Sequence, residues 1–277
     1  MSGDSIKISV VVISFNGKRF IEDCLSSTIA SFTTQNHEII IIDNGSIDGS
    51  PDIIKSKFPE LTLIENNQNL GFAPAVNQGL NAANGEYILI LNQDTKIQDK
   101  AIEKLAERMK NDKLIGSIGP KFIGFDGQLQ KCARAFPRYR DLLWQYAGLS
   151  GLFPQSKIFS NWKMGWFDHL SEREVDQPMG AALMITRKTV ERVGYFDESF
   201  GIFFNDVDYC RRIREAGLKN LYYPSAVVAH YVGGSTEKMR PQMIRESHRS
   251  MYRYFKKYGR GGVAQPCLWF WGAVLYI

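Results

Sequence analysis

Two aspartates that follow apolar runs are the first candidates for chemistry in this chain. Residues 39–42 run directly into Asp43, and a polar pair separates residues 87–91 from Asp94. Continuous apolar runs of this kind are typical of strands buried on both faces of a parallel sheet. Because ligands bind beyond the carboxyl ends of such strands, both carboxylates are expected at one edge of the sheet. The pattern predicts a nucleotide site there, with Asp94 placed to handle a metal ion or a phosphate.

Each aspartate also has a purely structural interpretation. Asp43 begins the sequence Asp43-Asn44-Gly45-Ser46, which is typical of a tight turn with Asx capping. Asp94 has the alternative of a helix N-cap or a turn residue. Its position behind a fully apolar strand favours metal binding, because Mg²⁺ and Mn²⁺ prefer oxygen ligands and keep positions open for substrate phosphates.

Further polar side chains are expected around the same edge. A carboxylate such as Asp43 can accept the ring N–H of uracil or thymine, and Phe15 can stack on the face of the base. The chain lacks a GxxxxGK(S/T) loop and a GxGxxG turn after its first strand, which argues against a kinase or a dinucleotide dehydrogenase. The expected rim consists of Ser14, Phe15, Asn16, Asp43, Asn69, Gly71, Asn77 and Asp94.

Two acids, Asp206 and Asp208, stand at the start of a helix predicted over residues 207–216. Their spacing places them on different sides of that helix. The structural alternative is a favourable interaction with the helix dipole, which needs no chemistry. The dipole lowers the pKa of Asp206, whereas Asp208, Asp197 and Glu198 are expected to raise it. A carboxylate that stays ionised at neutral pH is what a general base for a sugar hydroxyl requires.

His230 follows the apolar residues 226–229 and precedes Gly233, Gly234 and Ser235. The functional interpretation makes His230 a metal ligand and places the glycine loop near a diphosphate. The alternative is a histidine at a strand end, followed by an ordinary glycine turn.

Alternating strand and helix patterns predict the scaffold, an α/β fold with a mostly parallel central sheet flanked by helices. Residues 124–175 show weak periodicity and are expected to form loops and short helices over the site. The strands are expected at residues 6–13, 38–42, 61–64, 87–94 and 180–186, and the helices at residues 20–29, 50 onward, 72–83, 101–109 and 207–216.

Composition is ordinary for a folded protein of 277 residues, with 44% hydrophobic and 23% charged residues. The net charge of +5 is mild and predicts no nucleic-acid partner. The four cysteines form no CxxC pair, so neither a zinc site nor a disulfide framework is expected. There is no signal-peptide pattern and no apolar stretch of the roughly 20 residues that span a bilayer. We therefore expect a protein of the reducing cytoplasm.

Taken in order, these segments resemble the family 2 glycosyltransferases of the GT-A fold, especially the rhamnosyltransferase-like branch. Singly each segment is weak, but the ordered set is specific. The matching segments are residues 10–16, 42–50, 69–73, 91–95, 196–198, 205–208 and 230–235.

The resemblance implies a role for each matching residue. Asp43 recognises the base, Asn92 and Asp94 stand in for the DxD metal motif, and His230 helps to hold the metal and the diphosphate. Asp206 matches the catalytic base of the family's Glu-Asp pair. Two positions depart from the family pattern, because Asn205 replaces the glutamate of that pair and Asn92 replaces the first aspartate of DxD. The acceptor is assigned to Gly180, Ala181 and Asp208.

The implied enzyme is an inverting glycosyltransferase that uses Mn²⁺ or Mg²⁺. The chain lacks the QxxRW motif of the processive synthases, so a non-processive enzyme is expected. By resemblance the donor is dTDP-rhamnose, with a UDP-hexose as the alternative, and the acceptor is a glycan or polyprenyl-diphosphate-linked glycan of cell-surface polysaccharide synthesis. A nucleotidyltransferase would need a glycine- and lysine-rich loop near the N-terminus. The alternative of a non-catalytic sugar- or nucleotide-binding scaffold is supported only by Asn205, which replaces the glutamate of the Glu-Asp pair.

The expected organisation is a GT-A domain over residues 1–235, with a nucleotide-sugar half (1–120) and an acceptor and catalytic half (121–235). Residues 236–277 are expected to form a helical tail in which basic residues are interleaved with aromatic ones. Such a tail suits peripheral contact with the inner face of the cell membrane. The equally weighted alternative is a helix that packs on the domain or on a second subunit in a homodimer.

Overall fold

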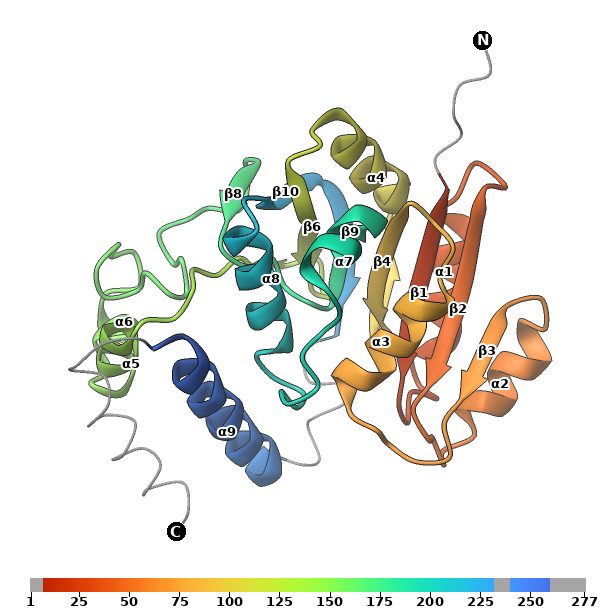
Figure 1. Cartoon of the computed structure of the whole chain (residues 1–277), viewed down its shortest axis with the longest axis horizontal. Helices are drawn as coiled ribbons and strands as arrows, with labels where there is room; N and C mark the ends of the chain where they lie inside the picture. The colour runs from red at the N-terminus through yellow and green to blue at the C-terminus, as the bar shows by residue number, and fades with distance from the viewer. Residues whose placement is uncertain (1–6, 232–239, 260–277) are drawn as a thin grey trace.

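The computed structural model describes residues 7–231 and 240–259. In this part of the chain, ten strands form one mixed sheet in the order β3-β2-β1-β4-β9-β6-β10-β5, with β7 beside β6 and β8 beside β10. Helices cover both faces of this sheet (Figure 1). The strands are β1 (Ile8–Ser14), β2 (His37–Asp43), β3 (Thr62–Glu65), β4 (Tyr87–Asn92), β5 (Thr95–Ile97), β6 (Ile115–Ile123), β7 (Leu129–Gln130), β8 (Arg173–Val175), β9 (Ala182–Thr186) and β10 (Lys219–His230).

From β1 to β4, in the first half of the chain, helices alternate with strands. In the second half, α5 and α6 follow each other without an intervening strand. None of the helices in the described ranges combines the length and the hydrophobicity needed to cross a bilayer. The helices are α1 (Ile21–Ala30), α2 (Ser50–Lys57), α3 (Phe72–Ala82), α4 (Ala101–Asn111), α5 (Tyr139–Tyr146), α6 (Leu149–Leu152), α7 (Arg187–Val193), α8 (Asn205–Glu215) and α9 (Arg240–Tyr258).

The apolar runs that predicted buried strands divide their side chains between two cores. On β1, Val10 and Val12 pack with α1 and α4 on one face, whereas Val11 and Ile13 pack with α3 and α8 on the other. Strands β2 and β4 alternate in the same way, because successive side chains of a strand point to opposite faces. The strands β3, β2, β1 and β4 are parallel to one another, and β9 then enters antiparallel to β4.

Strand β6 was not expected from the sequence, because its Gly119-Pro120 pair is typical of a strand end. Pro120 pairs with Tyr223 of β10, and the register of the two strands shifts directly after this pair. A proline cannot donate to a sheet ladder, so it is tolerated where the ladder is irregular.

Helix α9 packs on the domain. Its Met251, Tyr254 and Phe255 are buried in a cluster that also contains Leu142 and Phe204. The packing alternative for the tail is therefore realised over residues 240–259. The apolar run 268–277, on which the membrane interpretation of the tail also depended, lies outside the described residues.

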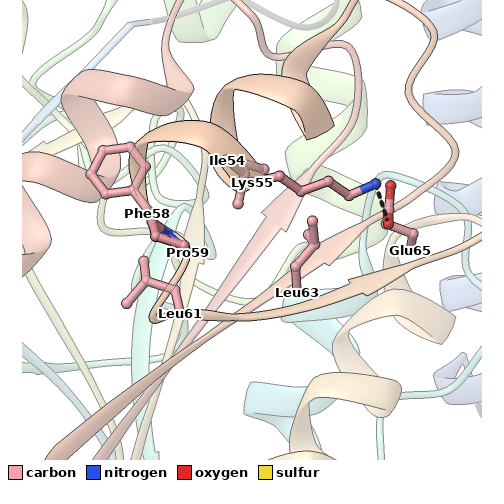
Figure 2. A pocket seen from close by; sticks show the side chains of 7 residues that line it. All are labelled: Ile54, Lys55, Phe58, Pro59, Leu61, Leu63 and Glu65. Atoms are coloured by element: carbon pink, nitrogen blue, oxygen red, sulfur yellow. Dashed lines mark ion pairs between the residues drawn. The ribbon is translucent and has the colours of Figure 1, made fainter.

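An open hollow of ≈ 300 Å³ lies between α2 and the edge strand β3 (Figure 2). Its lining includes Phe58, Leu63 and the ion pair of Lys55 with Glu65, whose Nζ and Oε1 are 2.8 Å apart. Neither Asp94 nor Asp206 lines it, so this hollow is separate from the strand-end site described below.

Candidate active site

Three parallel strands end side by side and bring their polar residues to one edge. Ser14 of β1 is in register with Asp43 of β2, and Ile13 is in register with Asn92 of β4. The backbone N–H of Asn44 donates to the carbonyl of Ser14 at 2.7 Å. The predicted convergence of these strand ends is therefore present.

Asp43 closes the turn that follows β2. Its Oδ1 accepts from the backbone N–H of Ser46 at 2.8 Å, and its Oδ2 accepts from the Ser46 hydroxyl at 2.6 Å. Ser46 Oγ in turn accepts from the backbone N–H of Asn16 at 2.8 Å. Gly45 has a φ of 80°, a conformation that favours glycine. The structural interpretation of Asp43 is thus realised, and base recognition by its remaining lone pairs stays a prediction.

Asn44, which was expected only as part of the turn after Asp43, organises the neighbouring loop. Its Oδ1 accepts from Leu70 N at 3.0 Å, and its Nδ2 donates to Asn69 Oδ1 and to the carbonyl of Gly71, both at 3.0 Å. Asn69 and Gly71 are therefore held at this edge. The available signal was an amide side chain directly after a buried strand.

Asn77 does not fit its predicted role at the nucleotide rim. Its Nδ2 donates to the carbonyl of Phe196 at 3.0 Å and to Glu198 Oε1 at 2.8 Å, and its Oδ1 accepts from Phe196 N at 2.9 Å. The side chain is buried and attaches the loop before α8 to α3. These bonds occupy the amide, so its contribution is structural.

Gln93, which was not a predicted site residue, clamps the end of β1. Its Oε1 accepts from Ser14 Oγ and from Phe15 N, both at 2.9 Å, and its Nε2 donates to the carbonyl of Phe15 at 2.8 Å. The amide therefore pairs with the Phe15 backbone in both directions. This contact fixes where Phe15 leaves the sheet.

The strongest indication of a cation comes from two buried oxygens. Oδ1 of Asn92 and Oδ1 of Asp94 have no hydrogen-bond partner within the described residues. Buried acceptors are costly when unpaired, and a divalent cation is a ligand that satisfies oxygens of this kind. In residues 7–231 and 240–259, no three or more His, Cys, Asp or Glu side chains are arranged so that they could hold a metal ion, so the set depends on the amide oxygen of Asn92.

His230 completes this set. Its Nε2 lies 3.8 Å from Asp94 Oδ1, and Tyr231 N donates to the Asp94 carbonyl at 2.9 Å. Burial raises the pKa of Asp94 to about 6 and lowers the pKa of His230 to about 4. Asp94 is thus mainly anionic and His230 neutral at neutral pH, which are the forms that bind a metal.

Gln130 fixes the orientation of His230. Its Nε2 donates to the His230 carbonyl at 2.7 Å, and its Oε1 lies 3.2 Å from His230 Nδ1. Since an amide oxygen only accepts, Nδ1 carries the proton and Nε2 keeps its lone pair on the side of Asp94. Gln130 was not predicted, because it is brought to His230 by the pairing of β7, β6 and β10.

Asp206 stands at the start of α8, and its carboxylate is held by three donors. Oδ2 accepts from Gln177 Nε2 at 2.7 Å and from Gly180 N at 3.1 Å, and Oδ1 accepts from Val207 N at 2.9 Å. Burial is the largest influence and raises the pKa of Asp206, whereas the hydrogen bonds lower it. Burial rather than the neighbouring acids thus causes the rise. The adjacent Asn205 donates its amide to the carbonyl of Gly201 at 2.9 Å.

The backbone before β9 joins the two halves of the site. Asn92 N donates to the carbonyl of Ala181 at 2.9 Å, and Gly180 N donates to Asp206. A Cβ at Gly180 would lie 2.9 Å from Asp206 Oδ2, so only glycine permits this approach. Asp206 and the pair Asn92 and Asp94 therefore share one edge of the sheet, and Gly180 and Ala181 position them through their backbone.

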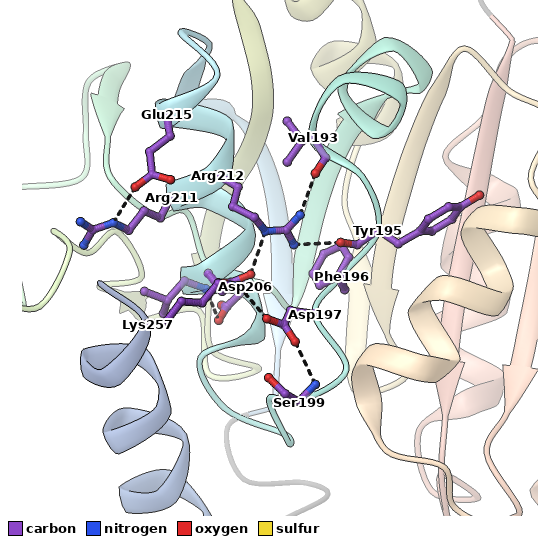
Figure 3. Close-up of polar contacts among 12 residues, drawn as sticks. Val193, Tyr195, Phe196, Asp197, Ser199, Asp206, Arg211, Arg212, Glu215 and Lys257 are labelled. Carbon is purple, nitrogen blue, oxygen red and sulfur yellow. Dashed lines mark hydrogen bonds and ion pairs between the residues drawn. The ribbon is translucent and has the colours of Figure 1, made fainter. Parts of the chain in front are cut away.

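Asp208 lies on the other side of α8, as the spacing predicted. Its side chain is fully buried; Oδ2 accepts from Arg212 Nε at 2.9 Å, and Oδ1 accepts from the Tyr258 hydroxyl at 2.7 Å. Lys257 Nζ is 2.7 Å from the same Oδ1. The same Nζ is 2.6 Å from Asp197 Oδ2 (Figure 3). This burial does not fit the expectation that Asp208 contacts an acceptor. The residue anchors α9 to the helix that carries Asp206.

Known proteins with a similar sequence identify the family of this chain. The model of Glycosyl transferase family 2 matches residues 9–160. The N-acetylglucosaminyl-diphospho-decaprenol L-rhamnosyltransferase of Mycobacterium tuberculosis is 26% identical over 276 residues, which cover 95% of this chain and 88% of that protein.

Two solved structures share the architecture. The mannosyltransferase PcManGT from Pyrobaculum calidifontis, in complex with GDP-Man and Mn²⁺, has a TM-score of 0.63 at 21% identity, covering 98% of this chain and 70% of its own. GalNAc-T7 with UDP, GalNAc and Mn²⁺ has a TM-score of 0.62 at 17% identity, and the match covers 82% of this chain and 43% of GalNAc-T7. The predicted GT-A fold is confirmed.

Proposed function

Because this chain belongs to glycosyl transferase family 2, we propose that it is an inverting, non-processive glycosyltransferase that moves rhamnose from dTDP-rhamnose to a polyprenyl-diphosphate-linked glycan. The observation that carries the proposal is the position of Asp206, which Gln177 and Gly180 hold beside the backbone that also pairs with Asn92. The choice of rhamnose is supported by the mycobacterial rhamnosyltransferase, which matches along 95% of the chain.

In the proposed reaction, Asp206 accepts the proton of the acceptor hydroxyl as that oxygen attacks the anomeric carbon. The new glycosidic C–O bond forms while the bond from the anomeric carbon to the donor phosphate breaks, and the nucleoside diphosphate leaves with the electron pair. Gln177 and Gly180 keep the carboxylate in one orientation, which favours proton transfer by a positioned base. Attack from the opposite face inverts the anomeric configuration.

Asn92, Asp94 and His230 are the residues that would hold a divalent cation, Mn²⁺ or Mg²⁺. The fit rests on the two buried oxygens that have no partner in the described part of the chain and on the Nε2 lone pair of His230. When bound, the cation supplies positive charge that stabilises the diphosphate leaving group. Gln130 orients the imidazole, in the manner of residues that support metal ligands.

The donor nucleotide is assigned to the ends of β1 and β2. Phe15, held by Gln93, stacks on the base, and Asp43 accepts its ring N–H. Ser14, Asn16, Asn69 and Gly71 shape the surrounding rim. We assign residues 1–120 to this donor half, residues 121–235 to the acceptor and catalytic half, and the enzyme to the cytoplasmic face of the membrane.

Asp206→Asn tests the base directly. Transfer should fall by about 10²–10⁴-fold, because the amide cannot accept the proton, while calorimetric binding of dTDP stays unchanged. Glu215→Gln, at the other end of α8 and exposed, is the control and should transfer normally. Turnover of Asp206→Asn close to that of the unaltered enzyme would remove this residue from the role.

A panel of nucleotide sugars tests the donor and the metal together. Thermal shifts should be largest with dTDP-rhamnose plus Mn²⁺, and Asp94→Ala should weaken the dependence on Mn²⁺. A larger shift with a UDP-hexose would replace rhamnose by the alternative donor. Absence of donor cleavage and of transfer with every nucleotide sugar would favour a non-catalytic scaffold.

A further inference from the structure

Large apolar side chains are exposed along the α5–α6 segment. Leu143 is 62% exposed, Tyr146 52%, Leu152 72%, Phe153 50% and Ile158 61%, all within a short stretch of chain. Single exposed apolar residues are normal, but these five all fall within residues 143–158, and such a concentration is typical of an interaction surface. We call these five residues the apolar ridge.

Helix α9 lies beside α5, the helix that carries Leu143 and Tyr146 of the ridge (Figure 1). Nε2 of His248 is 3.3 Å from the Tyr146 hydroxyl, and the rings of Phe255 and Tyr139 are 4.4 Å apart. Helices α5 and α9 are therefore parts of one packed unit. Tyr146 of the ridge therefore lies next to α9.

The outer surface of α9 is cationic. Exposed basic residues recur three or four positions apart, which places them on one face of the helix. This basic stripe consists of Arg245, Arg249, Arg253 and Lys256. Arg253 pairs with Glu246 at 3.5 Å, whereas Arg245, Arg249 and Lys256 have no carboxylate partner within residues 7–231 and 240–259.

Acids are sparse around this surface. Residues 142–167 contain no Asp or Glu, but they contain Lys157 and Lys163. In residues 240–259, Glu246 is the single acid among six Lys and Arg side chains. An apolar surface flanked by cations is complementary to a lipid bilayer, whose interior is apolar and whose headgroups can be anionic.

We propose that the apolar ridge and the basic stripe together dock this protein on a bilayer that contains anionic phospholipid. The exposed leucine, isoleucine and aromatic side chains enter the headgroup boundary, and the arginine and lysine side chains contact lipid phosphates. A purely protein partner explains the ridge, but it gives no reason for a stripe of unpaired cations beside an acid-free segment. The docking surface thus lies on the body of the protein.

This surface is connected to the catalytic helix. Lys257 and Tyr258, at the end of α9, contact Asp208 of α8, two residues after Asp206. Leu142 of α5 packs in the same cluster as Phe204, which precedes α8. Docking would present the Asp206 site to an acceptor whose lipid chain lies in the bilayer. This role of the docking surface rests on the proposed function.

Vesicle flotation of the full chain tests the proposal. The protein should float with vesicles of phosphatidylcholine and phosphatidylglycerol, and binding should fall with added salt. Each cation near the surface contributes a factor of about five in binding, so Arg245→Gln/Arg249→Gln/Lys256→Gln should weaken it by about two orders of magnitude. Leu152→Ser/Ile158→Ser should weaken binding as well.

Matched controls are available on other surfaces. Lys96→Gln/Lys110→Gln/Lys188→Gln removes the same charge from exposed positions, and Leu114→Ser removes an apolar residue that is 53% exposed. Both controls should float as the unaltered protein does. Equal flotation of the stripe, ridge and control variants would overturn the proposal, and so would equal flotation on pure phosphatidylcholine.

Two measurements separate this proposal from its alternatives. With a short water-soluble acceptor, the stripe and ridge variants should keep the transfer rate, whereas with a vesicle-embedded polyprenyl-diphosphate acceptor they should lose it. If the unaltered protein floats but transfers no sugar, and the stripe and ridge variants do not float, the proposed function is refuted and the docking surface is supported. A change from dimer to monomer in sedimentation, with flotation unchanged, would make the surface a subunit interface and refute docking.

Discussion

The buried carboxylate of Asp208 permits a sharp test of how α8 is held in place. Two i,i+4 ion pairs lie on this helix, Asp208 with Arg212 and Arg211 with Glu215. In the first pair the carboxylate is 0% exposed, and in the second it is 55% exposed. The two pairs have the same spacing, but the buried carboxylate of Asp208 also contacts Lys257 and Tyr258, whereas that of Glu215 is exposed.

Asp208→Asn should destabilise the protein strongly. The amide is neutral and presents N–H groups to the donors Arg212, Lys257 and Tyr258, whose positions are set by the native carboxylate. Removing one partner of a buried pair costs about 3–5 kcal/mol. Glu215→Gln breaks only an exposed pair and should cost about 0–1 kcal/mol.

The measurement is urea unfolding followed by circular dichroism, with both variants compared at one pH and one salt concentration. A Tyr258→Phe variant, which removes one hydrogen bond to the carboxylate, should fall between them at about 1.5–3 kcal/mol. If Asp208→Asn loses less than about 1 kcal/mol, the assignment of Asp208 as an anchor is wrong. Nucleotide binding by folded Asp208→Asn should be unchanged, since both oxygens of Asp208 are engaged by Arg212, Lys257 and Tyr258.

Three further perturbations have defined outcomes. Gln177→Met removes a hydrogen bond that lowers the pKa of Asp206, while burial continues to raise it, so the acidic limb of the pH–rate profile should move to higher pH; an unmoved limb contradicts the proposed base. Gln130→Met leaves Nδ1 of His230 without its partner and should weaken Mn²⁺ binding by about 10–100-fold in calorimetry, and unchanged affinity would remove Gln130 from the metal site. Burial raises the pKa of Asp197, but hydrogen bonds, chiefly from Lys257, lower it from 3.8 to about 2. The ionised Asp197 therefore contributes its full stabilisation at pH values above the pKa of the unfolded state, and this contribution is lost as the pH falls towards 2. Asp197→Asn should therefore flatten the acid side of the stability curve, which urea unfolding at several pH values would reveal.

The sequence alone predicted the parallel half of the sheet and its helices well. Strands β1, β2 and β4 are buried on both faces, so they appear as unbroken apolar runs, and the polar residues that end these runs mark the edge of the sheet. The order of motifs also pointed to the family that the family model matches over residues 9–160. These features are local or depend on sequence order, and a single chain displays both.

The partners of the candidate residues could not be predicted in the same way. Gln130 meets His230 across 100 positions of sequence, and Gln177 meets Asp206 across 29. Asn77 and Asp208 are polar residues in suitable segments, yet both side chains are engaged in buried hydrogen bonds. Asn77 bonds to Phe196, and Asp208 bonds to Arg212 and Tyr258. The residue type alone does not distinguish a ligand from an anchor.

What the sequence by itself determined is therefore the layered scaffold, the edge where polar side chains collect, and the family. Only the tertiary structure decided that Asn92 and Asp94 keep oxygens without a partner among the described residues, that Asp206 is oriented by the segment before β9, and that α9 packs on the domain. The physical reason is that hydrophobic periodicity records which face of an element is buried. The pairing of a polar group depends on which distant donors the completed fold brings within hydrogen-bond reach.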